Sequence, residues 1–163
     1  MKNLYLIRHA KSDWCDESKS DFDRGLNKRG EKAILTMANV LKEKKIMPDI
    51  ILSSSAKRAK LTAKGLAKEI EYSGKIKYID ALYMAEPETI QGLIKDINNK
   101  YDSLFVVGHN PETTELSNML IDDYIDNVPT LGIVALKLPI NNWKAFKIGK
   151  GKMQFFIYPK MFK

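Results

Sequence analysis

The sequence contains little cysteine, few histidines and no long apolar run. Its single cysteine, Cys15, excludes an internal disulfide and fits a reducing compartment. No apolar stretch approaches the roughly 20 residues that a membrane-spanning helix requires. Arg8 and His9 interrupt the N-terminal apolar stretch too early for a signal peptide. These absences predict a cytoplasmic protein that does not contact a membrane.

Internal repeats, low-complexity segments and linker-like changes in composition are also absent from the sequence. A length of 163 residues suits one domain and is short for two. A domain of this size buries about two-thirds of the surface of its unfolded chain. We therefore predict a single domain over residues 1–163, and the sequence leaves the oligomeric state open.

Basic residues outnumber acidic ones and give a formal net charge of +7. A positive charge favours anionic partners, either nucleic acid or phosphorylated molecules. The lysines are spread along the chain rather than gathered on one helix or tail, which is typical of a solvated surface. We therefore expect no nucleic-acid partner; such a partner would bind with an affinity that falls steeply with salt.

Short apolar runs alternate with amphipathic stretches along most of the chain. The runs predict strands at 3–7, 49–52, 76–79, 104–107, 133–138 and 154–158. The amphipathic stretches predict helices at 30–44, 57–71, 87–97 and 112–120. This alternation indicates a three-layer α/β domain whose mainly parallel sheet has helices on both faces. The last two strands, joined by a turn-rich segment without a helix, should form an antiparallel edge.

Charged and polar residues follow three of the predicted strands. Arg8 and His9 end the first strand, three serines and Arg58 follow the second, and His109 follows the fourth. Both histidines of the chain lie at such ends. Ligands of open parallel sheets bind outside the carboxyl ends of the strands, so we expect these side chains to meet in one crevice.

Two predicted helix starts lie beside these residues. Asn110 is a good N-cap with Pro111 at the first helical position, and Ser54 or Ser55 could cap the helix that carries Arg58. Helix N-termini and guanidinium groups both favour a bound anion. A neutral imidazole among them can attack phosphorus near pH 7. Each of these residues, taken alone, more often has a structural role or lies exposed on the surface. A protein module that binds phosphate without catalysing a reaction remains an alternative interpretation.

Five segments carry a family resemblance: "LYLIRHAKSDW", "DFDRGLNKRG", "PDIILSSSAKRAKLTA", "ALYMAEPE" and "LFVVGHNP". They occur in this order between about residues 3 and 138. Together they resemble the histidine phosphatase superfamily, and most of all its small SixA-like phosphohistidine phosphatase branch. Arg-His alone is a weak motif, whereas the ordered set is specific. The resemblance implies a phosphoglycerate-mutase-like fold.

The resemblance also assigns roles. His9 would be the nucleophile, becoming transiently phosphorylated before water releases the phosphate. The phosphoryl group would be bound by Arg8, Arg58 and His109, with Arg24, Ser12 and Asn110 as further substrate-binding candidates. No metal or other cofactor is implied, because the arginines supply the positive charge.

Several residues depart from the pattern of the family. The wider superfamily usually has glycine after the nucleophile. Here the residue is Ala10, and alanine is also found in much of the SixA-like branch. Cys15 falls where an asparagine often contacts phosphate. Glu112 falls where glycine is common, and its carboxylate should point outward or else weaken anion binding. Glu86 is the candidate general acid with Asp13 behind it, unless both are solvated loop carboxylates.

The implied substrate is phosphohistidine on a partner protein. Its phosphoramidate leaving group needs less help from an acid than an alkoxide does. The segment from 72 to 103 has room for only one strand and one helix and for no inserted segment over the pocket. We therefore predict an open, shallow site. The alternative within the superfamily is a phosphatase or mutase for small phosphomonoesters.

Overall fold

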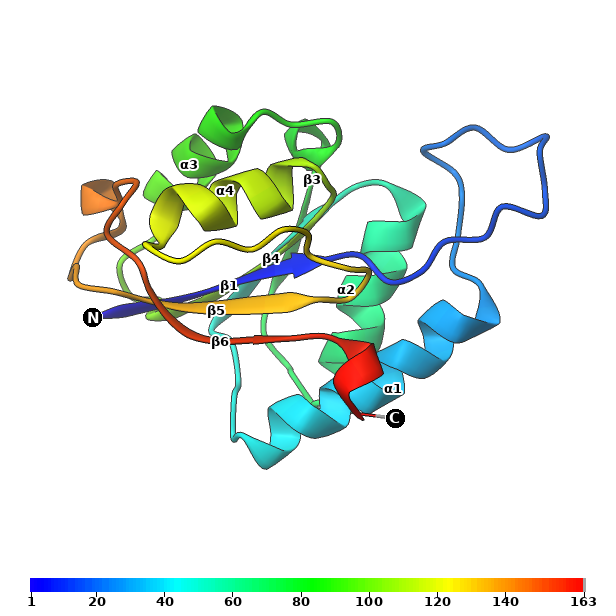
Figure 1. The fold of residues 1–163 in the computed structure, drawn as a ribbon, viewed down its shortest axis with the longest axis horizontal. Coiled ribbons are helices and arrows are strands. Elements are labelled where there is room, and N and C mark those ends of the chain that lie inside the picture. Colours follow the sequence, from blue (N-terminus) through cyan, green and yellow to red (C-terminus); the bar gives the residue numbers. More distant parts are fainter. Residues whose placement is uncertain (163) are drawn as a thin grey trace.

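The computed structural model describes residues 1–162, which form six β-strands and four α-helices around one sheet (Figure 1). The strands are β1 (Lys2–Arg8), β2 (Ile50–Ser54), β3 (Ile76–Ile79), β4 (Ser103–Gly108), β5 (Ile133–Leu138) and β6 (Lys152–Ile157). The helices are α1 (Lys28–Glu43), α2 (Lys57–Glu69), α3 (Pro87–Lys95) and α4 (Glu112–Leu120). None of the helices within 1–162 is both long and apolar enough to cross a membrane.

The strands follow the order β3-β2-β4-β1-β5-β6 across the sheet. The first four strands of the chain pair in parallel, while β5 pairs antiparallel with both β1 and β6. The predicted mainly parallel sheet with an antiparallel C-terminal edge is therefore confirmed. Because β1, β2 and β4 are parallel neighbours, their carboxyl ends meet at one edge of the sheet.

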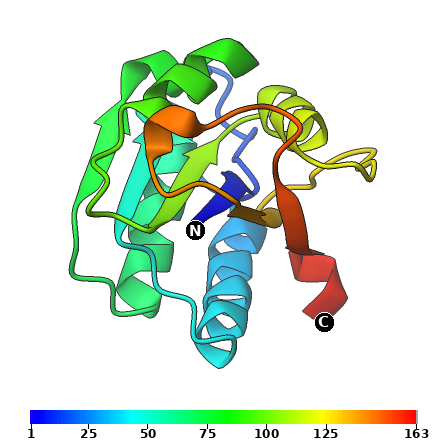
Figure 2. The same ribbon diagram turned by 90° about the vertical axis from the view of Figure 1, so that its left-hand side faces the viewer.

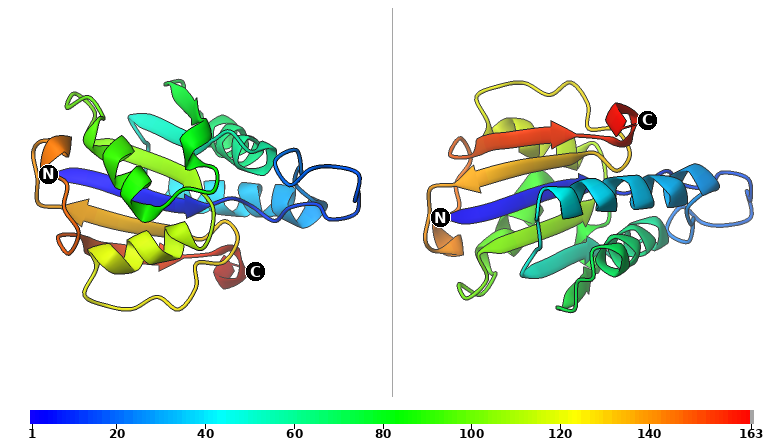
Figure 3. Two further views of the ribbon diagram at one scale, coloured as in Figure 1. Left: turned by 90° about the horizontal axis from the view of Figure 1, so that it is seen from above. Right: turned by 90° about the horizontal axis from the view of Figure 1, so that it is seen from below.

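Helices cover both faces of the sheet, as the views from the side and from above and below show (Figures 2 and 3). Leu4 and Leu6 of β1 pack into the hydrophobic cluster that contains α3 and α4. Ile7 and the partly buried Tyr5 belong to the cluster that contains α1 and α2. Side chains of a strand alternate between its faces, so one apolar run serves both layers.

Two local expectations need correction. The segment between β5 and β6 contains a short 3-10 helix, η2 (Trp143–Ala145), because the side chain of Asn142 caps it and Trp143 is fully buried. Helix α4 begins at Glu112, as predicted, but Pro111 occupies the N-cap position that was expected of Asn110. The Oδ1 atom of Asn110 still accepts from the backbone N–H of Thr114 at 3.3 Å.

The loop between β1 and α1 extends past the strand ends in Figure 1. Gly30 allows the end of the loop to pack closely against its start, because a Cβ atom at position 30 would collide with the backbone of Lys11. The N-cap Asn27 accepts from Gly30 N–H at 2.8 Å, and its own N–H donates to the Lys11 carbonyl at 3.1 Å. These contacts hold the start of the loop against α1.

Candidate active site

A pocket of about 330 Å³ lies at the carboxyl ends of β1 and β4. Residues from four separate parts of the chain line it: Arg8, His9, Lys11, Ser12, Trp14, Arg58, His109, Asn110 and Thr130. Six of these were singled out from the sequence, and the topology brings them together. Lys11, Trp14 and Thr130 were not. Trp14 and Lys11 belong to the segment that directly follows the first strand.

His9 is held so that one ring nitrogen faces the pocket. Its Nδ1 atom lies 2.7 Å from the carbonyl oxygen of Ala10. A carbonyl only accepts hydrogen bonds, so we assign the proton to Nδ1 and the lone pair to Nε2. The backbone N–H of Ala10 in turn donates to Thr62 Oγ1 at 2.9 Å. The residue after His9 is thus fixed at both its N–H and its carbonyl.

Arg58 connects His9 to the loop that follows β1. Its Nε atom donates to His9 Nε2 at 3.3 Å. Its Nη1 and Nη2 atoms donate to the backbone oxygen and to Oδ2 of Asp21, at 2.7 and 3.0 Å. The hydroxyl of Tyr83 donates to the same Oδ2 at 2.6 Å. The Asp21 carboxylate therefore orients the guanidinium against the imidazole of His9.

His109 stands beside His9, with ring centroids 5.1 Å apart. Its Nε2 atom lies 2.8 Å from Ser54 Oγ, and that oxygen accepts from the N–H of Ala56 at 3.2 Å. With Ser54 donating its proton to Nε2, the proton of the ring resides on Nδ1. Within residues 1–162, Nδ1 is buried without a protein partner, so its N–H could donate to a bound group.

Arg8 supplies the second guanidinium. Its Nη1 atom donates to the carbonyl of Val128 at 3.1 Å, and its buried Nε has no hydrogen-bond partner within the described chain. Its backbone is fastened to the 129–132 turn, where Gly132 accepts from its N–H and Leu131 donates to its carbonyl. Arg8 and Arg58 together place two positive charges on one pocket, which suits a phosphate dianion.

Burial and the two arginines keep both imidazoles neutral. Burial, together with Arg58 and Arg8, lowers the pKa of His9 from 6.5 to about 4. Burial, together with the neighbouring His9 and Arg58, lowers the pKa of His109 to about 3. A hydrogen bond to the Ala10 carbonyl acts in the opposite direction on His9 but does not outweigh desolvation. Near pH 7 the imidazole of His9 is therefore neutral, and the guanidinium groups of Arg8 and Arg58 lie beside it.

Comparison with protein families identifies the chain. Residues 4–116 match the family model of the histidine phosphatase superfamily (branch 1), which is more than half of the sequence. The chain belongs to the histidine phosphatase superfamily. Within it the chain is SixA-like, and it is a phosphatase.

Solved histidine phosphatases share the fold over nearly the whole chain. A crystal structure from Agrobacterium tumefaciens that carries the name phosphohistidine phosphatase SixA is 30% identical, with a TM-score of 0.83, covering 97% of this chain and 98% of that one. The protein histidine phosphatase SixA complexed with tungstate is 20% identical, with a TM-score of 0.84 and 99% of each chain covered. The fold class implied by the resemblance is confirmed.

A curated relative from a plant matches nearly the whole of this chain and is itself longer. It is an uncharacterised chloroplastic protein of Arabidopsis thaliana that is 29% identical over 172 aligned residues. The match covers 97% of this chain and 78% of the relative.

Two features of this histidine phosphatase differ from their expected placement. The helix that carries Arg58 has Ala56 at its N-cap without a side-chain cap, because it begins at Lys57 and Ser54 is still the last residue of β2. Arg24 does not line the pocket; its guanidinium carbon lies 3.5 Å from the ring centroid of Trp14. Trp14, which is 66% exposed, lines the pocket instead.

The carboxylates lie around the pocket rather than in it. Glu86 is exposed and lines a neighbouring pocket of about 850 Å³ along α4. Asp13 accepts from the N–H of Cys15 at 2.8 Å, which lowers its pKa and keeps it deprotonated, so it is poorly suited to donate a proton. Glu112 does not point outward: it is 4% exposed, and burial raises its pKa. Cys15 itself is exposed.

The missed residue with the most contacts to the site is Asp21. It belongs to the segment "DFDRGLNKRG" and precedes Arg24 by three positions. The sequence shows that Asp21 lies close to Arg24. Nothing in the sequence connects it with Arg58, which is 37 residues further along the chain. The contact depends on the path of a loop, which periodicity does not describe.

Proposed function

We propose that this chain is a metal-independent phosphatase that removes phosphate from phosphohistidine on a partner protein through a phospho-His9 intermediate. The observation that carries the proposal is the fixed ring of His9. The Ala10 carbonyl holds Nδ1 at 2.7 Å, which leaves the Nε2 lone pair at the pocket beside Arg58. A neutral, pre-oriented imidazole is suited to nucleophilic attack on phosphorus.

The reaction proceeds in two balanced steps. Nε2 of His9 forms a bond to phosphorus while the P–N bond of the substrate breaks, and the leaving imidazole takes a proton from solvent. Water then attacks the phosphorus of phospho-His9, and phosphate leaves as the imidazole is restored. Arg8, Arg58 and His109 donate to the phosphoryl oxygens throughout and stabilise the charge that develops there. The arginines do the work that a metal ion does in kinases.

Two structural features favour a protein-bound phosphoramidate as the substrate. Between β3 and β4 the chain forms a 3-10 helix, η1 (Asp80–Leu82), and then α3, which packs against α4 over the sheet. No inserted segment therefore covers the pocket from this part of the chain. Glu86 stands outside the pocket, which fits a leaving group that needs little acid assistance.

The decisive experiment traps the intermediate. Wild-type protein is mixed with a phosphohistidine peptide, quenched in alkali, digested and mapped by mass spectrometry for acid-labile phosphate. We expect the label on His9, and we expect His9→Ala to lose turnover by at least about 1,000-fold while keeping a cooperative unfolding transition. Activity should persist in EDTA. Label on another residue, or turnover in His9→Ala near that of wild type, would falsify the mechanism.

The alternative substrate class is a small phosphomonoester. A pocket of about 330 Å³ has room for a phosphorylated metabolite of modest size. Rates on sugar phosphates measured beside rates on a phosphohistidine protein separate the two. A phosphate-binding module without turnover would have no use for the oriented nucleophile. The cytoplasmic location, the absence of a nucleic-acid partner and the roles of Ser12 and Asn110 stay predictions.

A further inference from the structure

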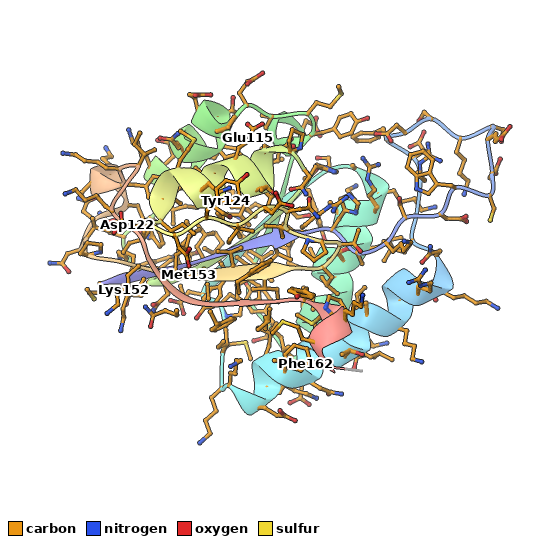
Figure 4. All side chains as sticks on the ribbon, viewed as in Figure 1. Glu115, Asp122, Tyr124, Lys152, Met153 and Phe162 are labelled. Atoms are coloured by element: carbon orange, nitrogen blue, oxygen red, sulfur yellow. The ribbon has the colours of Figure 1, made fainter. Side chains whose placement is uncertain are left out.

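A second, larger groove continues from the active-site pocket. It has a volume of about 930 Å³ and shares two lining residues, Lys11 and Thr130, with the pocket that contains His9. One wall is helix α1. The other is formed by the 129–130 turn and the C-terminal 3-10 helix η3 (Pro159–Phe162). Figure 4 shows the labelled Phe162 next to α1. A chain bound at His9 could therefore extend into this groove without leaving the protein surface.

The α1 wall is a single face of the helix. Arg29, Lys32, Ala33 and Thr36 line the groove and are spaced i, i+3, i+4 and i+7. Residues at this spacing lie above one another on a helix. Glu31 and Leu35 lie off this face and do not line the groove. The helix thus presents its cations toward the groove and keeps the nearby carboxylate away from it.

The groove differs in charge from the pocket on the other side of the active site. Four cations line the groove: Lys11, Arg29, Lys32 and Lys160. No carboxylate of residues 1–162 lines it. The pocket along α4, which meets the active site at Asn110, is lined by four carboxylates and no lysine or arginine of the described chain: Glu86, Glu88, Glu115 and Asp126. Figure 4 shows Glu115 over α4, far from Phe162 at α1.

We propose that the α1 groove docks an acidic segment of the phosphohistidine-bearing partner protein, adjacent to its phosphorylated histidine. This inference depends on the proposed function and adds the chemistry of the partner to it. Complementary charge steers the encounter and fixes its direction, because the acidic pocket along α4 repels the same segment. Tyr158, Pro129 and Phe162 give the groove an apolar lining, which suits a peptide better than a free ion.

Three synthetic phosphohistidine peptides test the proposal. One carries four aspartates before the histidine, one carries them after it, and one carries asparagines on both sides. At low salt, we expect wild type to hydrolyse one of the acidic peptides with a kcat/KM about 10-fold above that of the neutral peptide. The preference should shrink as salt rises, because exposed charges are screened.

Charge reversal on α1 tests where the preference originates. Arg29→Glu with Lys32→Glu should reduce it to about 1-fold, mainly through KM, and should change p-nitrophenyl phosphate turnover by less than about 2-fold. Neither residue lines the pocket of His9. Glutamate in the first turns of α1 is compatible with the helix dipole. Arg29→Gln with Lys32→Gln, a milder change, should give an intermediate preference.

Lys144→Glu with Lys147→Glu is the matched control. Both lysines are exposed near η2, at the far end of the sheet, and the pair changes the net charge equally. Equal rates of wild type on all three peptides would overturn the proposal. So would a preference that survives reversal on α1, or one lost equally in the control. A groove that binds tripolyphosphate but no acidic peptide would be a small-anion site.

Different results would contradict the proposed function and the docking of an acidic segment. If wild type hydrolyses p-nitrophenyl phosphate but none of the three peptides, the proposed function is wrong and the docking inference falls with it. If all three peptides are hydrolysed without preference, the proposed function stands and the docking inference alone is wrong.

Discussion

The pocket is built from two regions of opposite character, the strand ends and the loop between β1 and α1. The strand ends bury His9 and His109 at 7% and 5% exposure. The loop contributes Trp14, which is 66% exposed, to the pocket wall. It also contributes Asp21, whose side chain is 47% exposed and which bonds Arg58 without lining the pocket. The two regions meet at Arg58, which contacts His9 through Nε and Asp21 of the loop through Nη2. We infer that the residues at the strand ends carry out the reaction and that the loop adjusts its rate through its contact with Arg58.

Arg58→Ala should have the largest effect among the variants that test this division. It removes a cation, the donor to His9 Nε2 and the anchor of the loop together. We expect kcat/KM to fall about 1,000-fold, in line with the loss of one preorganised donor to a developing charge. Arg58→Lys keeps the charge without the planar fork and should still lose about 100-fold. Steady-state kinetics on a phosphohistidine peptide measure both.

Two controls sharpen that result. Lys64→Ala, on an exposed position of the same helix, should stay within about 2-fold of wild type. Arg24→Ala alters the loop side, where the guanidinium stacks on Trp14, and should cost less than Arg58→Ala. If Arg24→Ala abolished turnover while Arg58→Ala kept a tenth of it, the loop and not the sheet edge would hold the phosphoryl group.

The buried region should also make stability depend on pH. The pKa of His9 lies near 4 in the folded protein and near 6.5 when unfolded, so the unfolded chain binds more protons between these values. The contribution of His9 to the free energy of unfolding is fully present above pH 6.5 and is lost as the pH drops toward 4. The loss from His9 alone is about 3 kcal/mol in the free energy of unfolding. Urea unfolding at a series of pH values measures it.

Nuclear magnetic resonance gives a direct check, because the chain has two histidines. His109→Gln assigns the remaining imidazole signal to His9. We expect no titration of that signal near pH 6.5 and a midpoint close to 4. A midpoint near 6.5 would mean that water reaches the imidazole freely, and the contrast between a buried strand edge and an exposed loop would not hold.

The same contrast explains what could be predicted from the sequence. The sheet, its antiparallel edge and the meeting of Arg8, His9, Arg58 and His109 followed from apolar periodicity and from the geometry of parallel strands. Each of these side chains sits directly at or just beyond a strand end, so topology alone places it. The family resemblance added their roles.

The loop could not be predicted in this way. No periodicity constrains residues between β1 and α1, and the contacts of Asp21 and Arg24 depend on side chains far away in sequence. The predicted caps of α2 failed for a related reason. Ser54 and Ser55 have the right residue type, but the helix has Ala56 at its N-cap, and Ser54 ends β2 with its Oγ 2.8 Å from His109.

Asp21→Asn should give the smallest effect, and it probes the loop most directly. The substitution keeps the shape of the side chain and removes the negative charge that holds Nη2 of Arg58 at 3.0 Å. Two consequences oppose each other. The pocket loses a carboxylate that repels a phosphate dianion, and Arg58 loses the ionic partner that orients it.

The loss of orientation should dominate. A hydrogen bond between charged groups contributes about 1.5–3 kcal/mol, whereas repulsion between exposed charges about 4 Å apart in water is about 1 kcal/mol. We therefore expect kcat to fall about 10-fold with little change in KM. Asp23→Asn is the matched control, because its carboxylate bonds Ser20 and not Arg58. Faster turnover in Asp21→Asn would show that the loop restrains Arg58 rather than positioning it.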